Sequence, residues 1–429
     1  MEPGSSEKFL SSAPAYGIWL LVVASVISWR QGVIFDGGLD AVVLAKAAVA
    51  GVAAVAAVIA AASAKHRRSV GGMSLGLIAL IVAISTLGAF AGNELASAIV
   101  LAARIGLLSI TILFIVSANS TVSAISSLLA AMATIGLVAG VAGIGTLASE
   151  GRLRGGFPPL APNELAGLLL APLVGLFFIM VSRKVTVGNS VLFAVLLSAI
   201  YLTGSRTGLA ALAISLALVV LMSPRISRAV AIGALVAIPI GYALVVFTDL
   251  IGEVVYRGEG TSRLLTLNSR TVAWEVVLNI PSDTWRWWIG AGLALKVIGV
   301  NERFRDEQVL DSSWISSLAQ SGVIGTALLA TLVVVTLIRV WRAHPLRPVM
   351  LPLLALILVR SFLENGLVES SVTFTLFFTI AIVSEKRTPQ TLQPVYSSAA
   401  SARPLQNMPR MMVTTTVRGR DSIEARTIG

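Results

Sequence analysis

Residues 310–325 read LDSSWISSLAQSGVIG, and this stretch decides how the chain must be folded. An aspartate, two serines and a tryptophan lead directly into an apolar run that continues past residue 325. The longest polar segment of the chain ends at the same place. A carboxylate at the start of such a run indicates that Asp311 lies where a loop enters a membrane.

The composition is that of an integral membrane protein. Hydrophobic residues make up 56% of the 429 residues and charged residues 12%, whereas soluble globular proteins are nearer to about 25% charged. The sequence has no cysteine, which excludes disulfides, thiolate metal ligands and thiol nucleophiles. The first residues are polar and lack a basic region followed by a small-residue cleavage site, so we expect the first apolar run to be a retained span.

The net charge of +11 does not indicate a nucleic-acid partner. The basic residues lie mostly in short loops between apolar runs and in the last forty or so residues. This distribution is typical of the charges that orient a membrane protein. We therefore expect membrane lipids, and no nucleic acid, as partners.

The apolar runs predict an all-α polytopic membrane protein. One span requires about 20 apolar residues, and on that basis we expect about twelve spans. They lie near 14–29, 41–64, 72–92, 96–117, 121–148, 163–182, 187–204, 206–222, 227–248, 320–338, 347–362 and 370–384. We expect residues 1–385 to form a single transmembrane domain and residues 386–429, which are rich in Ser, Thr, Pro and Arg, to form a disordered cytoplasmic tail.

The loops between the runs predict the orientation. Basic clusters fall on one face of the membrane, at Lys65–Arg68, Arg183–Lys184, Ser223–Arg228 and Arg339–Arg347. In the loops of the other face, acidic residues match or outnumber basic ones. Because basic loops stay in the cytoplasm, both termini are expected there.

The loop over residues 249–311 faces outward in this topology. Loops longer than about 15 residues are usually functional or disordered, and this one has a varied sequence with helical spacing of Trp274, Val277 and Leu278. Trp285, Trp287 and Trp288 suit a membrane interface. We expect a folded extracytoplasmic cap of short amphipathic helices.

Arginines gather on the outward face, against the usual trend. A guanidinium binds phosphate through a fork of donors and stays charged, so such a cluster suits a lipid-linked phosphate or diphosphate. Pairing with loop acids or lipid phosphates is the alternative for any one of them, but Arg206 lies in a very tight turn and Arg270 starts the amphipathic segment. The candidates for substrate binding besides these two are Arg263, Arg286 and Arg360.

Asp311 is the best placed candidate for a general base on the outer face. The two histidines, His66 and His344, fall in predicted cytoplasmic loops, so proton transfer outside requires a carboxylate or a less common group. Capping of the following helix is the alternative role for Asp311, and the two roles are compatible. Asn163 opens another span, where it fits either helix initiation or contact with a sugar.

Arg104 is the one charge predicted near mid-depth of a span. An isolated charge there costs at least about 2.5–3.5 kcal/mol, so it must face a cavity or a partner. The spans contain almost no acids, and the sequence names no partner for it.

The order of three segments resembles the superfamily of O-antigen ligases and O-antigen polymerases. The segments are LTGSRTGLAAL (202–212), NSRTVAWEVVLNIPSDTWRWWIGAGLA (268–294) and DSSWISSLAQSGVIGTALL (311–329), and FPPLAPNELAG (157–167) is similar to a segment upstream in that family. The similarity covers roughly residues 155–340. It implies a glycosyltransferase C-like membrane enzyme of the bacterial cytoplasmic membrane, which acts at the outer face without a metal or other cofactor.

The resemblance also implies roles for individual residues. The donor is a glycan on undecaprenyl diphosphate, and Arg206 and Arg270 match the family's arginines for the diphosphate. A histidine commonly stands where this chain has Asp311, so the identity of the base departs from the family pattern. Related shape, elongation, division and sporulation polymerases use an aspartate in a comparable place.

We therefore expect an inverting transfer in which Asp311 takes the proton of an acceptor hydroxyl. The acceptor is a glycan, a lipid or a protein, and both ligase and polymerase remain open. The alternative is a transporter or flippase of lipid-linked or small polar substrates, because twelve spans with both ends inside describe many carriers. Such carriers place their polar groups at mid-membrane, whereas here they crowd the outer rim. A non-catalytic scaffold or glycan-binding subunit is a third interpretation.

Overall fold

The structure is a computed structural model that describes residues 13–30, 38, 40–64, 70–182, 185–223, 233, 270–302, 305–343 and 346–385. All of them lie in the first of two units, Met1–Thr388 and Pro389–Gly429. The predicted span 227–248 apart from residue 233, Arg263 and the tail 386–429 lie outside the described residues. The predictions for these parts stay predictions.

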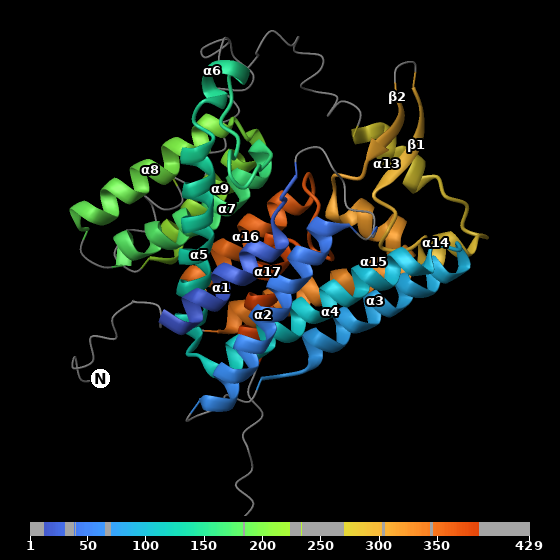
Figure 1. The fold of residues 1–429 in the computed structure, drawn as a ribbon, viewed down its shortest axis with the longest axis horizontal. Helices are drawn as coiled ribbons and strands as arrows, with labels where there is room; N and C mark the ends of the chain where they lie inside the picture. Colours follow the sequence, from blue (N-terminus) through green and yellow to red (C-terminus); the bar gives the residue numbers. More distant parts are fainter. Residues whose placement is uncertain are drawn as a thin grey trace, which may run out of the picture. The chain divides into compact units, whose positions relative to one another are not determined.

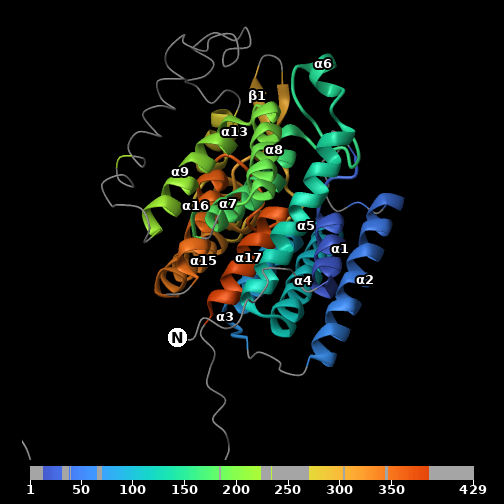
Figure 2. The same ribbon diagram turned by 90° about the vertical axis from the view of Figure 1, so that its left-hand side faces the viewer.

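The described residues form fourteen helices and one pair of strands (Figures 1 and 2). The helices are α1 (Ala13–Val26), α2 (Ala41–Ser63), α3 (Met73–Ala91), α4 (Leu95–Ala118), α5 (Thr121–Ala142), α6 (Thr146–Glu150), α7 (Pro162–Ser182), α8 (Val187–Thr203), α9 (Arg206–Met222), α13 (Arg270–Leu278), α14 (Trp285–Ile289), α15 (Ser313–Arg342), α16 (Arg347–Ser361) and α17 (Val372–Ser384). Every predicted span except 227–248 corresponds to one of these helices. The predicted span 121–148 ends earlier than expected, at Ala142, and a separate short helix follows.

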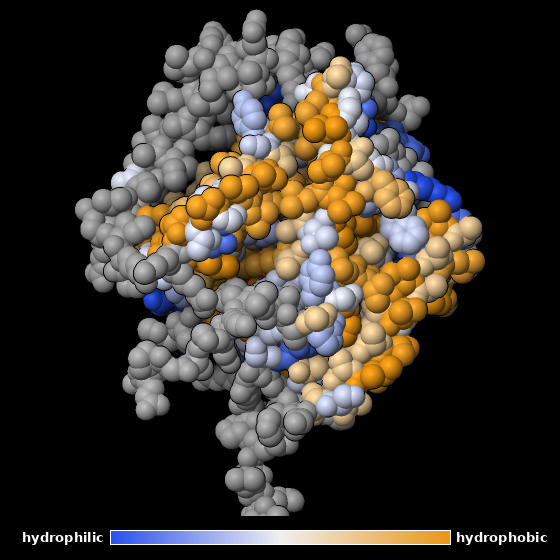
Figure 3. Space-filling model, turned by 60° about the vertical axis from the view of Figure 1, so that its left-hand side comes forward, coloured by the Kyte–Doolittle hydropathy of each residue, from blue (hydrophilic) through white to orange (hydrophobic). Residues whose placement is uncertain are grey.

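Ten of the described helices are apolar in the way that membrane spans are. By length and composition, α2, α3, α4, α5, α7 and α15 can each cross a bilayer, and α1, α8, α9 and α17 are shorter apolar helices. Their outer surface is apolar as well, as the orange side chains over much of the described surface in Figure 3 show. The chain is a polytopic membrane protein, and the count of about twelve spans remains a prediction.

The tight turn between the two helices 187–204 and 206–222 has a simple local cause. Gly204 ends α8 in the left-handed conformation, with φ of 62°, which glycine adopts at little cost. Ser205 then caps α9, because its side chain accepts a hydrogen bond from the backbone N–H of Gly208. One helix ends and the next begins within two residues.

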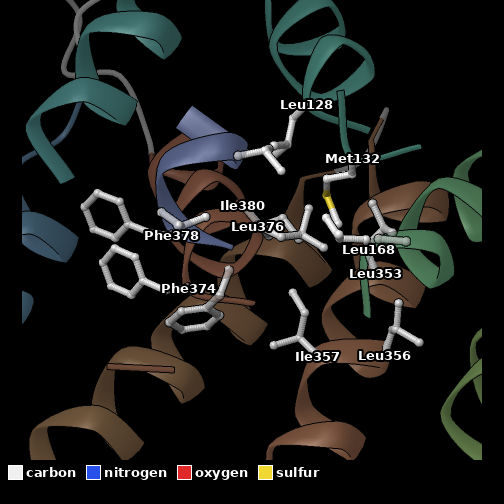
Figure 4. Close-up of a cluster of buried hydrophobic side chains, with 14 of the residues drawn as sticks. Leu128, Met132, Leu168, Leu353, Leu356, Ile357, Phe374, Leu376, Phe378 and Ile380 are labelled. Atoms are coloured by element: carbon white, nitrogen blue, oxygen red, sulfur yellow. The ribbon is translucent and has the colours of Figure 1, made fainter. Parts of the chain in front are cut away.

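Helix α17 lies at the centre of the bundle, packed against α4, α15, α16 and others. Its side chains are buried around the whole helix, and Phe374 and Phe378 stack with ring centroids 5.3 Å apart. In Figure 4 these rings lie beside leucines and isoleucines of α16 and α17, with Leu128 and Met132 of α5 and Leu168 of α7 close by. A helix that is apolar on every side is expected only inside a protein or a membrane.

Helix α15 is broken where the predicted span was expected to begin. Its residues start at Ser313 and not near 320, and Gly322 has φ of 64° and ψ of −168° inside the helix. The segment after α14 fills the break: Ala291 N–H donates to the carbonyl of Ala319 over 2.8 Å, and Gly292 N–H donates to that of Gln320 over 3.0 Å. Backbone carbonyls freed by a break in a membrane helix need such donors.

The cap contains strands as well as the expected short helices. Strands β1 (Val297–Glu302) and β2 (Arg305–Val309) form an antiparallel hairpin, with Val297 opposite Val309. We expected helices alone, although the run Val297–Val300 is rich in β-branched residues, which favour strands. The hairpin packs against α13, whose buried residues are Ala273 and Val277, while Leu278 is exposed.

Candidate active site

Several helix ends from distant parts of the sequence meet beside the cap. The start of α15 lies against the loop after α16, because Ser313 Oγ donates to the carbonyl of Glu364 over 2.9 Å. The start of α9 reaches the same loop, since Thr207 Oγ1 donates to Glu364 Oε1 over 3.4 Å. The end of α16 meets the start of α7, where Arg360 donates to the carbonyl of Asn163 over 3.1 Å. Hydrogen bonds therefore connect the ends of α7, α9, α15 and α16, where polar residues were expected at the outer rim.

Arg270 and Asp311 form an ion pair within this region. Arg270 Nε donates to Asp311 Oδ2 over 3.0 Å, and both side chains are about one-quarter to one-third exposed. Arg270 is the first residue of α13, and Asp311 lies just before α15. Because Nε makes this contact, the two terminal nitrogens of the guanidinium keep the fork that binds phosphate oxygens.

Asp311 does not cap the helix that follows it. The N-cap of α15 is Ser312, which makes no side-chain capping bond. The capping role considered for Asp311 is therefore wrong. Its carboxylate points instead to Arg270 of the cap, 41 residues earlier in the chain.

Glu364 links the separate parts of the site, and the sequence did not single it out. It lies in the loop after α16, where the charges of Arg360, Arg270 and Asp311 all act on it. Burial raises the pKa of its carboxyl above the ordinary value, and the two arginines partly offset that rise. The only sequence signal was its place in the outward loop SFLENGLVES (361–370), which served there only to assign topology.

Arg360 and Asn163 lie together at a cavity of about 170 Å³ next to Glu364. Arg360 is almost completely buried, at 8% exposed. Gly167 of α7 leaves room for it, because a side chain at Gly167 would meet the guanidinium 2.6 Å away. The backbone carbonyl of Asn163 accepts a hydrogen bond from Arg360, and Asn163 is one of the residues that line the cavity.

Arg206 is the first residue of α9, one position before the Thr207 that contacts Glu364. Arg152 holds the turn in front of it, donating to the carbonyls of Thr203 over 3.0 Å and Gly204 over 3.4 Å. Arg152 therefore stabilises the turn that directly precedes Arg206. The position of Arg206 follows from this turn and from the packing of α9 on α16.

Arg286 lies in a different part of the cap. It belongs to α14, which packs against α3 and α15, and its guanidinium lies 5.5 Å from the ring centroid of Trp285. The side chain is exposed. Arg263, the remaining arginine expected to bind substrate, lies outside the described residues.

A second polar cavity, of about 240 Å³, adjoins the first and contains Arg104. Glu164 and Glu369 line both cavities. Glu369 accepts hydrogen bonds from Lys296 and from Asn365 Nδ2, the latter over 2.6 Å, and its charge acts on Arg104. The spans contain almost no acids, but the charge of Glu369 acts on Arg104 from the loop between α16 and α17.

Residues 191–330 match the family model described as O-antigen ligase. The chain carries an O-antigen ligase domain. No curated protein matches the chain. The match confirms the resemblance read from the sequence and marks the protein as a glycosyltransferase-like membrane enzyme of polysaccharide biosynthesis.

The O-antigen ligase domain contains Arg206, Arg270 and Asp311. It runs from α8 to residue 330 of α15 and so includes the segment predicted to form the cap. Asn163, Arg360 and Glu364 lie outside it, on both sides in sequence, and reach the site through the packing of α7 and α16. The site is therefore completed by helices beyond the matched domain.

Proposed function

We propose that this protein transfers or polymerises a glycan, taking it from an undecaprenyl diphosphate carrier to an acceptor hydroxyl at the outer face of the cytoplasmic membrane. The observation that carries the proposal is the Arg270–Asp311 ion pair inside the O-antigen ligase domain, next to Glu364 and a polar cavity. In this proposal Arg270 is the cation that binds phosphate and Asp311 is the carboxylate that accepts a proton, and their ion pair supports the two roles acting side by side. The basic loops at the opposite helix ends support a cytoplasmic position for those ends.

In this mechanism the arginines take the developing charge of the leaving group. Arg206 and Arg270 bind the diphosphate, and fixed guanidinium groups stabilise charge that builds up as the sugar–phosphate bond breaks. The lipid diphosphate leaves with the bonding electrons. No nucleotide is needed, since the cleaved bond supplies the free energy.

Asp311 accepts the proton of the acceptor hydroxyl as its oxygen bonds to the anomeric carbon. A single displacement from the face opposite to the diphosphate inverts that carbon. An ionised carboxylate can only accept hydrogen bonds, so a hydroxyl beside Asp311 is oriented for this transfer.

Glu364 and Arg360 position and tune the site in this proposal. Glu364 shares the field of Arg270 with Asp311, so its charge state sets how much positive charge remains for the diphosphate. Arg360 is buried beside it and holds the loop to α7. We assign the cavity of about 170 Å³ beside Glu364 to the acceptor, with Asn163 in its wall.

Purified protein with a lipid-linked glycan and an acceptor tests the reaction directly. Turnover with release of the lipid diphosphate is expected, with inversion at the transferred sugar. Movement of an intact labelled lipid-linked sugar across vesicles, without turnover, would instead support a transporter or flippase.

The glycan phenotype of a deletion strain separates the two kinds of enzyme. Shortened chains indicate a polymerase, and unattached full-length chains indicate a ligase. Unchanged glycans of every class would contradict both.

A further inference from the structure

Trp29 borders the polar cavity of about 240 Å³, which lies where α1, α2 and α4 meet (Figure 2). It follows α1 and lies outside the O-antigen ligase domain. Its Nε1 donates to the carbonyl of Ala24 over 2.8 Å. Because Nε1 is the only polar atom of an indole, this bond holds the ring in place and leaves an apolar surface for the cavity.

The charged groups around the ring largely compensate one another. Arg30 pairs with Asp40 over 2.7 Å, and Lys296 pairs with Glu369. The charge of Glu369 also acts on Arg104. The cavity therefore does not depend on a charged ligand for its electrostatic balance.

The same groups keep a capacity for further hydrogen bonds. Glu164 accepts from Ser28 Oγ over 2.5 Å, and Lys46 donates to the carbonyl of Ile27 over 2.8 Å. A carboxylate has about four acceptor positions, and an ammonium group has three donors. The wall of the cavity therefore offers both donors and acceptors to a ligand.

A neutral sugar residue has the chemistry that fits this wall. Each of its hydroxyls can donate one hydrogen bond and accept others, while its C–H groups form an apolar face that can stack on an indole. A hydrocarbon chain would leave the polar groups of the wall without partners when it displaced their water. The combination of a fixed aromatic ring with paired charges thus favours a sugar.

The cavity is joined to the one beside Glu364, which has a volume of about 170 Å³. Val26, Glu164, Glu369 and Ser371 line both. Together the two cavities reach the range of about 300–1,000 Å³ that is usual for ligand pockets, whereas each alone is smaller. One elongated ligand can therefore occupy both.

We propose that the cavity beside Trp29 binds one sugar residue of a glycan that continues into the cavity beside Glu364. The assignment of this glycan to the acceptor rests on the proposed function. The sugar with the reacting hydroxyl then lies beside Glu364, on which the charge of Asp311 acts, and the next sugar lies against Trp29. The acceptor is accordingly a glycan of at least two sugars, and neither a lipid alcohol nor a protein.

Equilibrium dialysis of the full chain in detergent, without the lipid-linked donor, tests the sugar site. The probes are the oligosaccharides that mild acid releases from the strain's own membrane lipids, labelled and separated by length. We expect fragments of two or more sugars to bind at least about tenfold more tightly than single sugars, the effect of one added contact with a charged group. Unlabelled dodecanol and a short serine peptide, which represent the other acceptor classes, are expected to displace them poorly.

Two variants locate the bound glycan. Trp29→Ala removes the ring, and Val42→Phe narrows the cavity while it keeps the ring and every charge. Each is expected to lower the affinity for the longer fragments by about tenfold. Val52→Phe is the matched control, because it makes the same change in α2 at a residue that is 58% exposed and does not line the cavity. It is expected to bind as the parent does.

Three results overturn the inference. Unchanged binding of the longer fragments in Val42→Phe places the sugar elsewhere, and this variant decides the question even if Trp29→Ala does not fold. Displacement by dodecanol or the serine peptide as strong as that by unlabelled fragments shows that the cavity does not select glycans. Glycan transfer by a parent that binds no fragment contradicts the inference and leaves the proposed function intact. Binding that depends on Trp29, without any transfer, contradicts the proposed function and leaves the sugar site.

Discussion

Arg270 and Asp311 lie 41 positions apart in the sequence, and their side chains meet at 3.0 Å where the cap joins the membrane helices. The contact uses Nε of the arginine, so it fixes the plane of the guanidinium as well as its position. A lysine at this position would keep the charge without the planar fork. The pair explains why an aspartate precedes the apolar run of α15.

Replacement of Arg270 by lysine tests the geometry of the pair. We expect Arg270→Lys to lower kcat by about 10²–10³, the usual effect of losing one group that stabilises transition-state charge. Arg270→Ala is expected to do at least as much. Steady-state turnover of a lipid-linked glycan measures both, with Arg342→Gln as the control that removes an exposed arginine far from the site. Normal turnover in Arg270→Lys would mean that only its charge is used.

Glu364 predicts a dependence of donor binding on pH. Its pKa is raised by burial above 4.5, so the carboxyl stays protonated to a higher pH than usual and ionises as the pH rises through the raised value. The new negative charge offsets Arg270 and Arg360, and KM for the donor is expected to increase over that range. In Glu364→Gln this increase should vanish while kcat changes less than KM. A variant whose KM still follows pH as the parent's does would remove Glu364 from this role.

The backbone conformation at position 322 requires a glycine. Its φ of 64° and ψ of −168° lie in a region that is essentially reserved for glycine, and a side chain would also overlap the backbone of Trp288. We expect Gly322→Ala to lose at least about 1–3 kcal/mol from the backbone strain alone. Gly106→Ala in α4 is the matched control, because nothing lies within 4 Å of the added carbon. Thermal unfolding in detergent compares the two, and equal midpoints would contradict the observed break in α15.

Glu385 is expected to stabilise the fold by joining α15 to the start of α3, at the helix ends opposite to the site. Its carboxylate pairs with Arg339 of α15 over 3.1 Å and accepts from the backbone N–H of Ser74 at the start of α3 over 2.6 Å. Only 3% of its side chain is exposed. Glu385→Ala is expected to destabilise the fold by about 3 kcal/mol, because it leaves a half-buried arginine without its partner. The thermal unfolding midpoint measures this, and Arg342→Ala, which removes an exposed charge of the same helix, should leave it nearly unchanged.

The sequence predicted the positions of most apolar helices because hydropathy is a property of each segment by itself. Even the pair around TGSRTG (203–208) was found, since Gly204 and Ser205 signal the end of one helix and the start of the next. The break at Gly322 was missed. It depends on the close approach of residues 288–292, a contact between segments that hydropathy does not encode.

Only part of the site could be predicted, because the sequence shows residue types within a segment but not the contacts between segments. Arg270 and Asp311 could be selected as residue types at the outer rim, but their direct contact depends on how the cap folds back. Glu364 was missed because a short loop in which two acidic residues outnumber one basic residue gives only a topological signal. Its importance appears once α9 and α16 pack together. The partner of Arg104 was sought within the spans, whereas the charge of Glu369 acts on it from a loop.

The most direct measurement of the central claim is the single-turnover rate of Asp311→Asn with a lipid-linked glycan and its acceptor. The substitution keeps the shape of the side chain and a hydrogen-bond acceptor for Arg270 but cannot take a proton. We predict that donor binding is retained within about tenfold while the transfer rate falls by about 10²–10⁴, the range for losing a general base. Transfer at the parental rate by a correctly folded Asp311→Asn would contradict the account.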